Sequence, residues 1–244
     1  MPFQGIVTND NRFRLFLAAR LDPKAYLGLH LTIGLLVLSL ALWAFGALLE
    51  AVLDNRTLVR LDIAAAVWMH ARVTPFGLRF FDAVAEIASP DTMGILCVVV
   101  AVVLVGQGRR TACIAWVAAF VGGTVVQHIL KTAVHRSRPE FGAAYLSDKS
   151  FSFPSGHAMA VIVGMGMSLY ILGRFWHPGR AWRLGSIATG LVIIIIVGVS
   201  RIYLGVHYPS DVLGGYAAGA AWMAVCVSGL TIAEHRRAAR LSSF

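Results

Sequence analysis

Three short motifs in the second half of the chain combine histidines with cationic side chains. In chain order they are KTAVHRSRP over 131–139, PSGH over 154–157 and SRIYLGVHYPSD over 200–211. A phosphoryl group in transfer spreads negative charge over its oxygens, and cations aimed at them lower the barrier. Imidazole can attack phosphorus or transfer a proton near neutral pH. These residue types therefore indicate phosphoryl transfer, if the three motifs meet in space.

The cations of these motifs are Lys131, Arg138 and Arg201. Lysine supplies a point charge, and arginine supplies a planar fork that matches phosphate oxygens. Any one of them alone could instead extend toward lipid headgroups, as interfacial cations do. Three of them beside two histidines favour an anion site, because charges at membrane depth are costly and usually functional.

The PSGH motif begins an apolar run, where it forms a suitable helix start. Ser155 is a good N-cap, and Gly156 allows a backbone to approach a ligand closely. The unpaired N–H groups and the positive dipole end of a helix N-terminus bind anions. Simple capping explains the serine and the glycine, but it does not explain His157.

His207 and Asp211 stand four residues apart where the last apolar run begins. This spacing can bring an imidazole and a carboxylate within reach of each other. A carboxylate that accepts from one ring nitrogen fixes the tautomer and leaves the other nitrogen free to attack. The pair therefore has the form of an oriented imidazole.

The composition places these motifs in a membrane protein. The chain has 244 residues, of which 58% are hydrophobic and 14% charged, and its mean hydropathy is +0.73. These values are too apolar for an ordinary soluble domain. The formal net charge is +9, but the basic residues lie beside apolar segments and form no separate basic domain. We therefore expect membrane lipids as partners and no nucleic acid.

The hydropathy pattern predicts an all-α, polytopic membrane protein with six transmembrane helices, because runs of roughly 17–25 apolar residues can cross a bilayer. The predicted spans are 27–49, 92–107, 111–134, 157–173, 184–202 and 212–233. The second run is short, and we expect it to start near Ser89 and Pro90.

The positions of Lys and Arg predict the orientation in the membrane. Basic clusters lie before the first span, after the second, after the fourth and after the sixth: Arg12, Arg14, Arg20, Lys24, Arg109, Arg110, Arg174, Arg180, Arg183, Arg236, Arg237 and Arg240. Six crossings place all four clusters on one face, which the positive-inside rule makes cytoplasmic. Both termini are then cytoplasmic, and the three motifs lie at the opposite, extracytoplasmic face.

The segment between the first two spans, about 53–91, is longer than a turn needs. Its stretch FGLRFFDAVAEIA places Phe76, Phe80 and Phe81 at near-helical spacing with charges between them. This pattern predicts an extracytoplasmic helical segment that lies in the membrane interface and covers a lipid entrance. An ordinary packing helix fits the pattern equally well.

The ordered set K-x6-R-P, P-S-G-H and S-R-x5-H-x3-D resembles the phosphatidic-acid phosphatase type 2 superfamily, whose members also include the soluble vanadium haloperoxidases. The resemblance implies that His207 is the nucleophile and forms a phosphohistidine. It implies that Asp211 orients His207 and that His157 is the general acid and then the base. Phosphate would be held by Lys131, Arg138, Ser155, Gly156 and Arg201. The resemblance implies neither a metal nor another cofactor.

These observations predict a single membrane-embedded phosphatase domain over 1–244 in a bacterial inner (plasma) membrane. The expected reaction is hydrolysis of a lipid phosphomonoester or pyrophosphate. Candidate substrates are a polyprenyl pyrophosphate such as undecaprenyl pyrophosphate, phosphatidylglycerophosphate, phosphatidic acid and lipid A phosphate. A lipid phosphotransferase that passes the phosphoryl group to an alcohol is the main alternative, and a transporter or a degenerate relative is a third. The oligomeric state and the physiological lipid stay open.

Overall fold

A computed structural model describes residues 26–54, 56–141, 150–176 and 179–241, and its regular structure in these ranges is helical throughout. The helices are α2 (Tyr26–Asp54), α3 (Arg56–His70), α4 (Pro75–Glu86), α5 (Pro90–Gly106), α6 (Arg110–Val134), α7 (Gly156–Phe175), α8 (Arg180–Tyr203) and α9 (Pro209–Leu241).

The prediction of six membrane spans is confirmed, since six helical stretches of the described chain are long and apolar enough to cross a bilayer. The second of these stretches runs from Pro75 to Gly106 and so contains α4 as well as α5, whereas α5 itself begins where the sequence suggested. Ser89 is the N-cap of α5 and accepts a hydrogen bond from the Thr92 amide at 3.2 Å, and Pro90 follows at the first helical position. Proline suits this position because its missing N–H would have no helical partner there.

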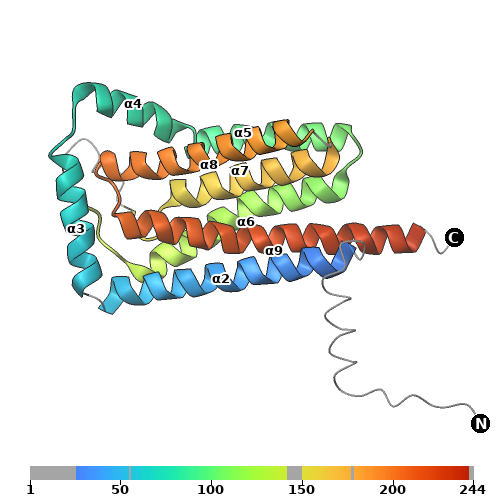
Figure 1. The fold of residues 1–244 in the computed structure, drawn as a ribbon, viewed down its shortest axis with the longest axis horizontal. Helices are drawn as coiled ribbons and strands as arrows, with labels where there is room; N and C mark the ends of the chain where they lie inside the picture. Colours follow the sequence, from blue (N-terminus) through green and yellow to red (C-terminus); the bar gives the residue numbers. More distant parts are fainter. Residues whose placement is uncertain (1–25, 55, 142–149, 177–178, 242–244) are drawn as a thin grey trace, which may run out of the picture.

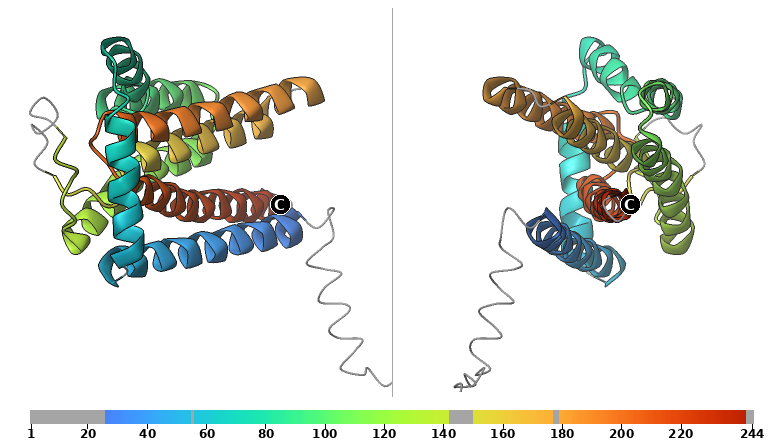
Figure 2. Two further views of the ribbon diagram at one scale, coloured as in Figure 1. Left: turned by 60° about the vertical axis from the view of Figure 1, so that its left-hand side comes forward. Right: turned by 90° about the vertical axis from the view of Figure 1, so that its right-hand side faces the viewer.

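The long helices form a bundle, and α3 lies across one end of it (Figure 1). The start of α2 and the end of α9 lie together at the opposite end (Figure 1). Figure 2 shows α3 upright against the ends of the long helices, with α4 beside its far end. An even number of crossings produces this arrangement, with both ends of the described chain on one side.

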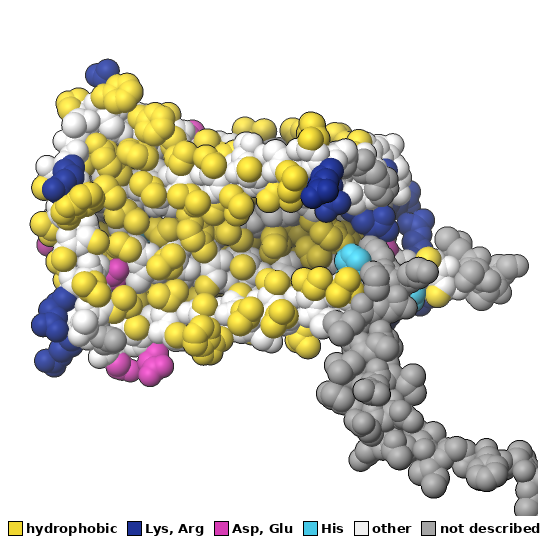
Figure 3. Space-filling view, in the orientation of Figure 1, with side chains coloured by type: hydrophobic (Ala, Val, Ile, Leu, Met, Phe, Trp, Pro, Cys, Tyr) yellow, Lys and Arg dark blue, Asp and Glu magenta, His cyan; other side chains and the backbone are white. Residues whose placement is uncertain are grey.

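The face of the bundle that Figure 3 shows is largely apolar along its length. Lys and Arg side chains lie toward the two ends of the molecule in the same view. Large apolar side chains are exposed on most of the long helices, among them Leu35, Val98, Ile129, Leu191 and Val225. An exposed apolar band between two charged ends matches the hydrocarbon core of a bilayer and its two interfaces.

Close packing of α9 on α7 positions the motif residues. A Cβ added at Gly215 would lie 2.5 Å from the carbonyl oxygen of Ser155, and one added at Gly219 would lie 3.0 Å from that of Met159. Small residues allow membrane helices to approach this closely. The first turn of α9, which contains Asp211, is therefore held against the start of α7.

The segment between the first two spans contains two helices, α3 and α4. The Thr74 side chain caps α4 by accepting from the Gly77 amide at 3.0 Å. The α4 helix packs on the end of α8 through Phe81 and its neighbours, whereas Phe76 and Phe80 face outward. The aromatic residues that the sequence pattern grouped together are thus divided between the protein interior and its surface.

Candidate active site

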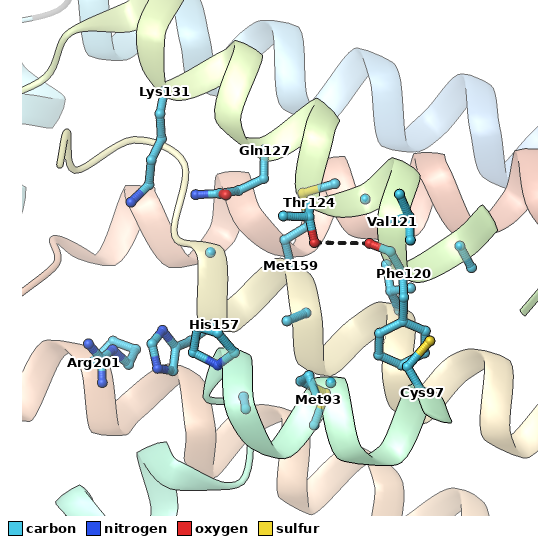
Figure 4. Close-up of a pocket in the computed structure, with 18 of the residues that line it drawn as sticks. Met93, Cys97, Phe120, Val121, Thr124, Gln127, Lys131, His157, Met159 and Arg201 are labelled. Carbon is cyan, nitrogen blue, oxygen red and sulfur yellow. Dashed lines mark hydrogen bonds between the residues drawn. The ribbon is translucent and has the colours of Figure 1, made fainter. Parts of the chain in front are cut away.

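The three motifs meet at the end of the bundle that carries α3. A cavity of about 540 Å³ opens there between α5, α6, α7 and the end of α8. Its polar wall contains predicted site residues from all three motifs: Lys131, Arg138, Gly156, His157, Arg201 and His207. In Figure 4, Lys131 approaches this space from α6, and His157 and Arg201 approach it from the facing side. The structure therefore brings cations and imidazoles from distant parts of the chain into one pocket.

Lys131 and Arg138 share one serine. The Lys131 ammonium donates to the Ser150 hydroxyl at 3.0 Å, and Nη2 of Arg138 donates to the same oxygen at 2.9 Å. Arg138 also donates from Nε to the Ser150 carbonyl at 2.9 Å. The chain returns toward Lys131 because His135 ends α6 in the left-handed region, with φ 54°, and its amide donates to the Lys131 carbonyl. Ser150 thus holds the two cations close together.

The start of α7 supplies Gly156 and His157 to the cavity wall. Ser155 is fully buried and is not part of that wall. Its hydroxyl accepts from the Ala158 amide at 3.5 Å, and its own amide donates to the Asp211 carbonyl at 2.9 Å. In this structure Ser155 therefore acts as a helix cap that also joins α7 to α9, and its contact with phosphate stays a prediction.

His207 and Asp211 are paired as their spacing predicts. Nδ1 of His207 lies 3.5 Å from Oδ2 of Asp211. Ser152 bridges the two residues, because its hydroxyl lies 3.4 Å from the same Nδ1 and donates to Oδ2 of Asp211. The Tyr208 amide also donates to Oδ2, at 2.8 Å. Asp211 itself lies behind His207, away from the cavity. The second ring nitrogen, Nε2, is therefore the one on the cavity side.

The environment of His207 favours its neutral form. Its exposed fraction is only 1%, and burial lowers the pKa of His207 to about 4. The Asp211 carboxylate opposes this shift, while the positive charges of Arg138 and Arg201 add to it. A neutral imidazole with one nitrogen held and the other facing the cavity is competent to act as a nucleophile.

A buried ion-pair network behind Asp211 was missed by the sequence analysis. Arg136 donates to Oδ1 of Asp211 at 2.6 Å and to Oδ2 of Asp62 at 2.8 Å. Asp62 comes from α3 and also accepts from the Ser210 amide at 3.1 Å. The Arg136 guanidinium lies over the Tyr208 ring, 4.5 Å from its centroid. The signal in the sequence was an isolated aspartate in the apolar stretch LDIAAAVW, because a charge in such a setting needs a partner.

The cavity continues from the cationic end into an apolar region. Met93, Cys97 and Val98 of α5 face Phe120 and Val121 of α6 across it. Figure 4 shows Met93, Cys97 and Phe120 together on the side away from Lys131. A pocket with cations and imidazoles at one end and apolar side chains at the other suits a phosphate that is attached to a hydrocarbon chain.

Comparisons with known proteins agree with this chemistry. The family model of the PAP2 superfamily matches residues 110–231. The chain is 38% identical over 96 residues to phosphatidylglycerophosphatase B of Bacillus subtilis, a match that covers 39% of this chain and 46% of the relative. It is 32% identical over 126 residues to undecaprenyl-diphosphatase of Sulfolobus acidocaldarius, with 50% and 56% covered. The matched segments thus span about half the length of these relatives.

A solved structure is similar over a larger part of the chain. It is the crystal structure of a transmembrane PAP2-type phosphatidylglycerolphosphate phosphatase from Bacillus subtilis, with a TM-score of 0.71 and 22% sequence identity. The similarity covers 78% of this chain and 93% of that one. It supports the multi-pass helical fold.

Proposed function

Because the chain belongs to the PAP2 superfamily and is a multi-pass membrane protein, we propose that it is a lipid phosphatase that acts through a phosphohistidine. The observation that carries this proposal is that two histidines and three cations line one cavity: His157, His207, Lys131, Arg138 and Arg201. The apolar continuation of the same cavity supports a lipid as the substrate.

The proposed reaction has two steps. Nε2 of His207 attacks phosphorus, and His157 donates a proton to the lipid oxygen as the bond to phosphorus breaks. Water then attacks the phosphohistidine while His157 takes a proton from it, which releases phosphate and restores the neutral His207 and the protonated His157. Lys131, Arg138 and Arg201 stabilise the charge on the phosphoryl oxygens in both steps. Gly156, and in this proposal the Ser155 hydroxyl, contribute neutral hydrogen bonds at the start of α7.

The proposed orientation places both termini in the cytoplasm and the cavity at the extracytoplasmic side of the inner membrane. It is supported by the basic residues Arg109, Arg110, Arg236 and Arg237, which lie at the end of the bundle opposite the cavity. A green fluorescent protein fused after Phe244 should fluoresce, since that fusion partner folds in the cytoplasm. If the fusion protein inserts in the membrane but does not fluoresce, the C-terminus is extracytoplasmic and the proposed orientation is wrong.

The proposed chemistry needs no metal ion, because three cationic side chains occupy the position that a divalent ion would take. Phosphate release should therefore continue in the presence of a chelator. A strict requirement for added Mg²⁺ would contradict this part of the proposal.

The decisive experiment measures phosphate release by the purified full-length protein in detergent. The substrates are phosphatidic acid, phosphatidylglycerophosphate, undecaprenyl pyrophosphate and lipid A, with the His207→Ala variant as the blank. Free phosphate in the absence of an added alcohol supports a hydrolase. Release that needs an acceptor alcohol would favour the phosphotransferase, and equal background from both proteins would end the proposal.

A further inference from the structure

Gln127 occupies the boundary between the cationic and apolar parts of the cavity. It lies four residues before Lys131 on α6, so both side chains project from the same face of the helix, about 5–6 Å apart along its axis. Both residues line the cavity. Figure 4 shows the Gln127 amide extending into the space that also receives the Lys131 ammonium.

The Gln127 amide is held against the start of α7. A Cβ added at Gly156 would lie 3.0 Å from Nε2 and 3.3 Å from Cδ of Gln127. The glycine therefore leaves room for this amide beside the proposed phosphate site. Within the part of the chain that the structure describes, the Gln127 side chain makes no hydrogen bond, so its donors and its acceptor remain available to a ligand.

The next polar side chain along the cavity has its hydrogen-bond donor already engaged. The Thr124 hydroxyl donates to the Phe120 carbonyl at 3.0 Å, as the dashed line in Figure 4 shows. Apolar side chains such as Met93 and Val98 follow. Along this path, Gln127 is thus the neutral polar group that a lipid meets between its phosphate and its hydrocarbon.

We propose that the Gln127 amide binds an oxygen on the carbon skeleton next to the phosphate, which selects phosphate esters of glycerol over isoprenoid phosphates. This inference rests on the proposed lipid phosphatase function. A glycerol phosphate carries a hydroxyl or an ester group on the carbon beside the phosphorylated one, whereas an isoprenoid chain offers only hydrocarbon there. Gln127 is half-buried, and a bound lipid would cover its amide. A site built to hydrogen-bond a substrate oxygen rejects an analogue that lacks it, because the polar group that the ligand covers is then left unpaired.

An isoprenoid diphosphate fits the Gln127 position less well for a second reason. Its inner phosphate would lie at about this level and carries negative charge. Gln127 offers a dipole and no charge, and Lys131 and Arg138 are joined through Ser150 at the other end of the cavity. Charge-assisted hydrogen bonds are about twice as strong as neutral ones, so a neutral amide is a poor choice for a second phosphate.

The test compares the wild type with Gln127→Leu, which keeps a similar size and removes the amide. We would measure kcat/KM for phosphate release from dioleoyl phosphatidic acid, dioleoyl phosphatidylglycerophosphate and farnesyl monophosphate in the same mixed micelles. The matched control is Gln107→Leu, because Gln107 lies at the opposite end of the bundle and accepts there from Arg109. Size-exclusion profiles of all three proteins establish that the variants are folded.

We expect Gln127→Leu to lower kcat/KM about tenfold on a glycerol-based substrate, equivalent to ~1.4 kcal/mol, and to leave farnesyl monophosphate unchanged or improved. A loss on phosphatidic acid identifies an ester oxygen as the partner, and a loss confined to phosphatidylglycerophosphate identifies the free hydroxyl. An equal effect on all three lipids, or none, would overturn the inference. A wild type that releases phosphate from none of them would instead overturn the proposed function.

Discussion

Arg136 donates to Oδ1 of Asp211 at 2.6 Å, while the other oxygen of the same carboxylate lies 3.5 Å from Nδ1 of His207. The carboxylate therefore joins a buried ion pair to the imidazole that we propose as the nucleophile. Asp62 of α3 forms a second ion pair with Arg136, at 2.8 Å. The contacts Asp62–Arg136 and Arg136–Asp211 thus link α3 to the carboxylate that orients His207.

The Arg136 network should be important for stability. Arg136→Gln leaves two buried carboxylates, Asp62 and Asp211, without their cation, and we expect a loss of about 3 kcal/mol or more in the free energy of unfolding. Thermal unfolding in detergent measures this loss as a clear fall in Tm.

The ion pair between Arg174 and Glu234 provides the control. Its two atoms are 3.2 Å apart, and its side chains are 36% and 20% exposed, compared with 11% for Arg136 and 3% for Asp62. Exposed pairs contribute about 0–1 kcal/mol, so Arg174→Gln should leave Tm nearly unchanged. Equal shifts in Tm for the two variants would contradict the proposed role of the network.

Asp211→Asn tests the orientation of His207 directly. The amide keeps the shape of the carboxylate but no longer fixes the tautomer with Nδ1 protonated, so kcat should fall by about a hundredfold to ten-thousandfold. KM should change little, because Asp211 does not line the cavity. Steady-state phosphate release over a range of lipid concentrations separates the two constants. A defect that appears mainly in KM would assign Asp211 to substrate binding instead.

The pH dependence follows from the lowered pKa of His207. Only the neutral imidazole attacks phosphorus, so protonation of His207 abolishes activity as the pH falls through its pKa. Since that pKa is about 4, rather than the ordinary value of 6.5, the acid limb of kcat/KM should lie near pH 4. The lipid phosphate has its own second ionisation near pH ~6, so the profile must be corrected with a titration of the lipid in the same micelles. A corrected limb near pH ~6.5 would mean that His207 is not held in its neutral form.

The six membrane spans and the meeting of the three motifs could be predicted from the sequence, because the bilayer constrains both. A bilayer fixes the length and polarity of each span, so hydropathy alone locates Lys131, His157 and Asp211 at helix ends. Successive spans alternate in direction, so the end of the third span and the starts of the fourth and sixth spans must lie on the same side. The order and spacing of the motifs then predicted the phosphoryl-transfer chemistry that we propose.

The contacts behind the cavity were not predictable in the same way. Asp62 and Arg136 are far apart in the sequence, and their pairing depends on how α3 crosses the bundle end, which hydropathy does not determine. Ser150 and Ser152 precede the PSGH motif as ordinary loop serines, yet they join the cations and hold Asp211. Serine is common in loops, so its type alone carried no signal.

Gly156→Ala tests the packing between the start of α7 and Gln127. The added methyl group would lie 3.0 Å from Nε2 and 3.3 Å from Cδ of Gln127, so the amide must shift by a few tenths of an ångström. We expect kcat/KM on glycerol-based lipids to fall at least about tenfold, since the displaced amide loses its ligand contact and the phosphate loses close approach to the backbone. Gly173→Ala is the matched control on the same helix, because nothing lies within 4 Å of the added methyl group there. Alanine is the better helix former by about 1 kcal/mol, so Gly173→Ala should keep its activity and gain slightly in Tm. If both variants keep full activity, the space beside Gly156 has no part in binding the substrate.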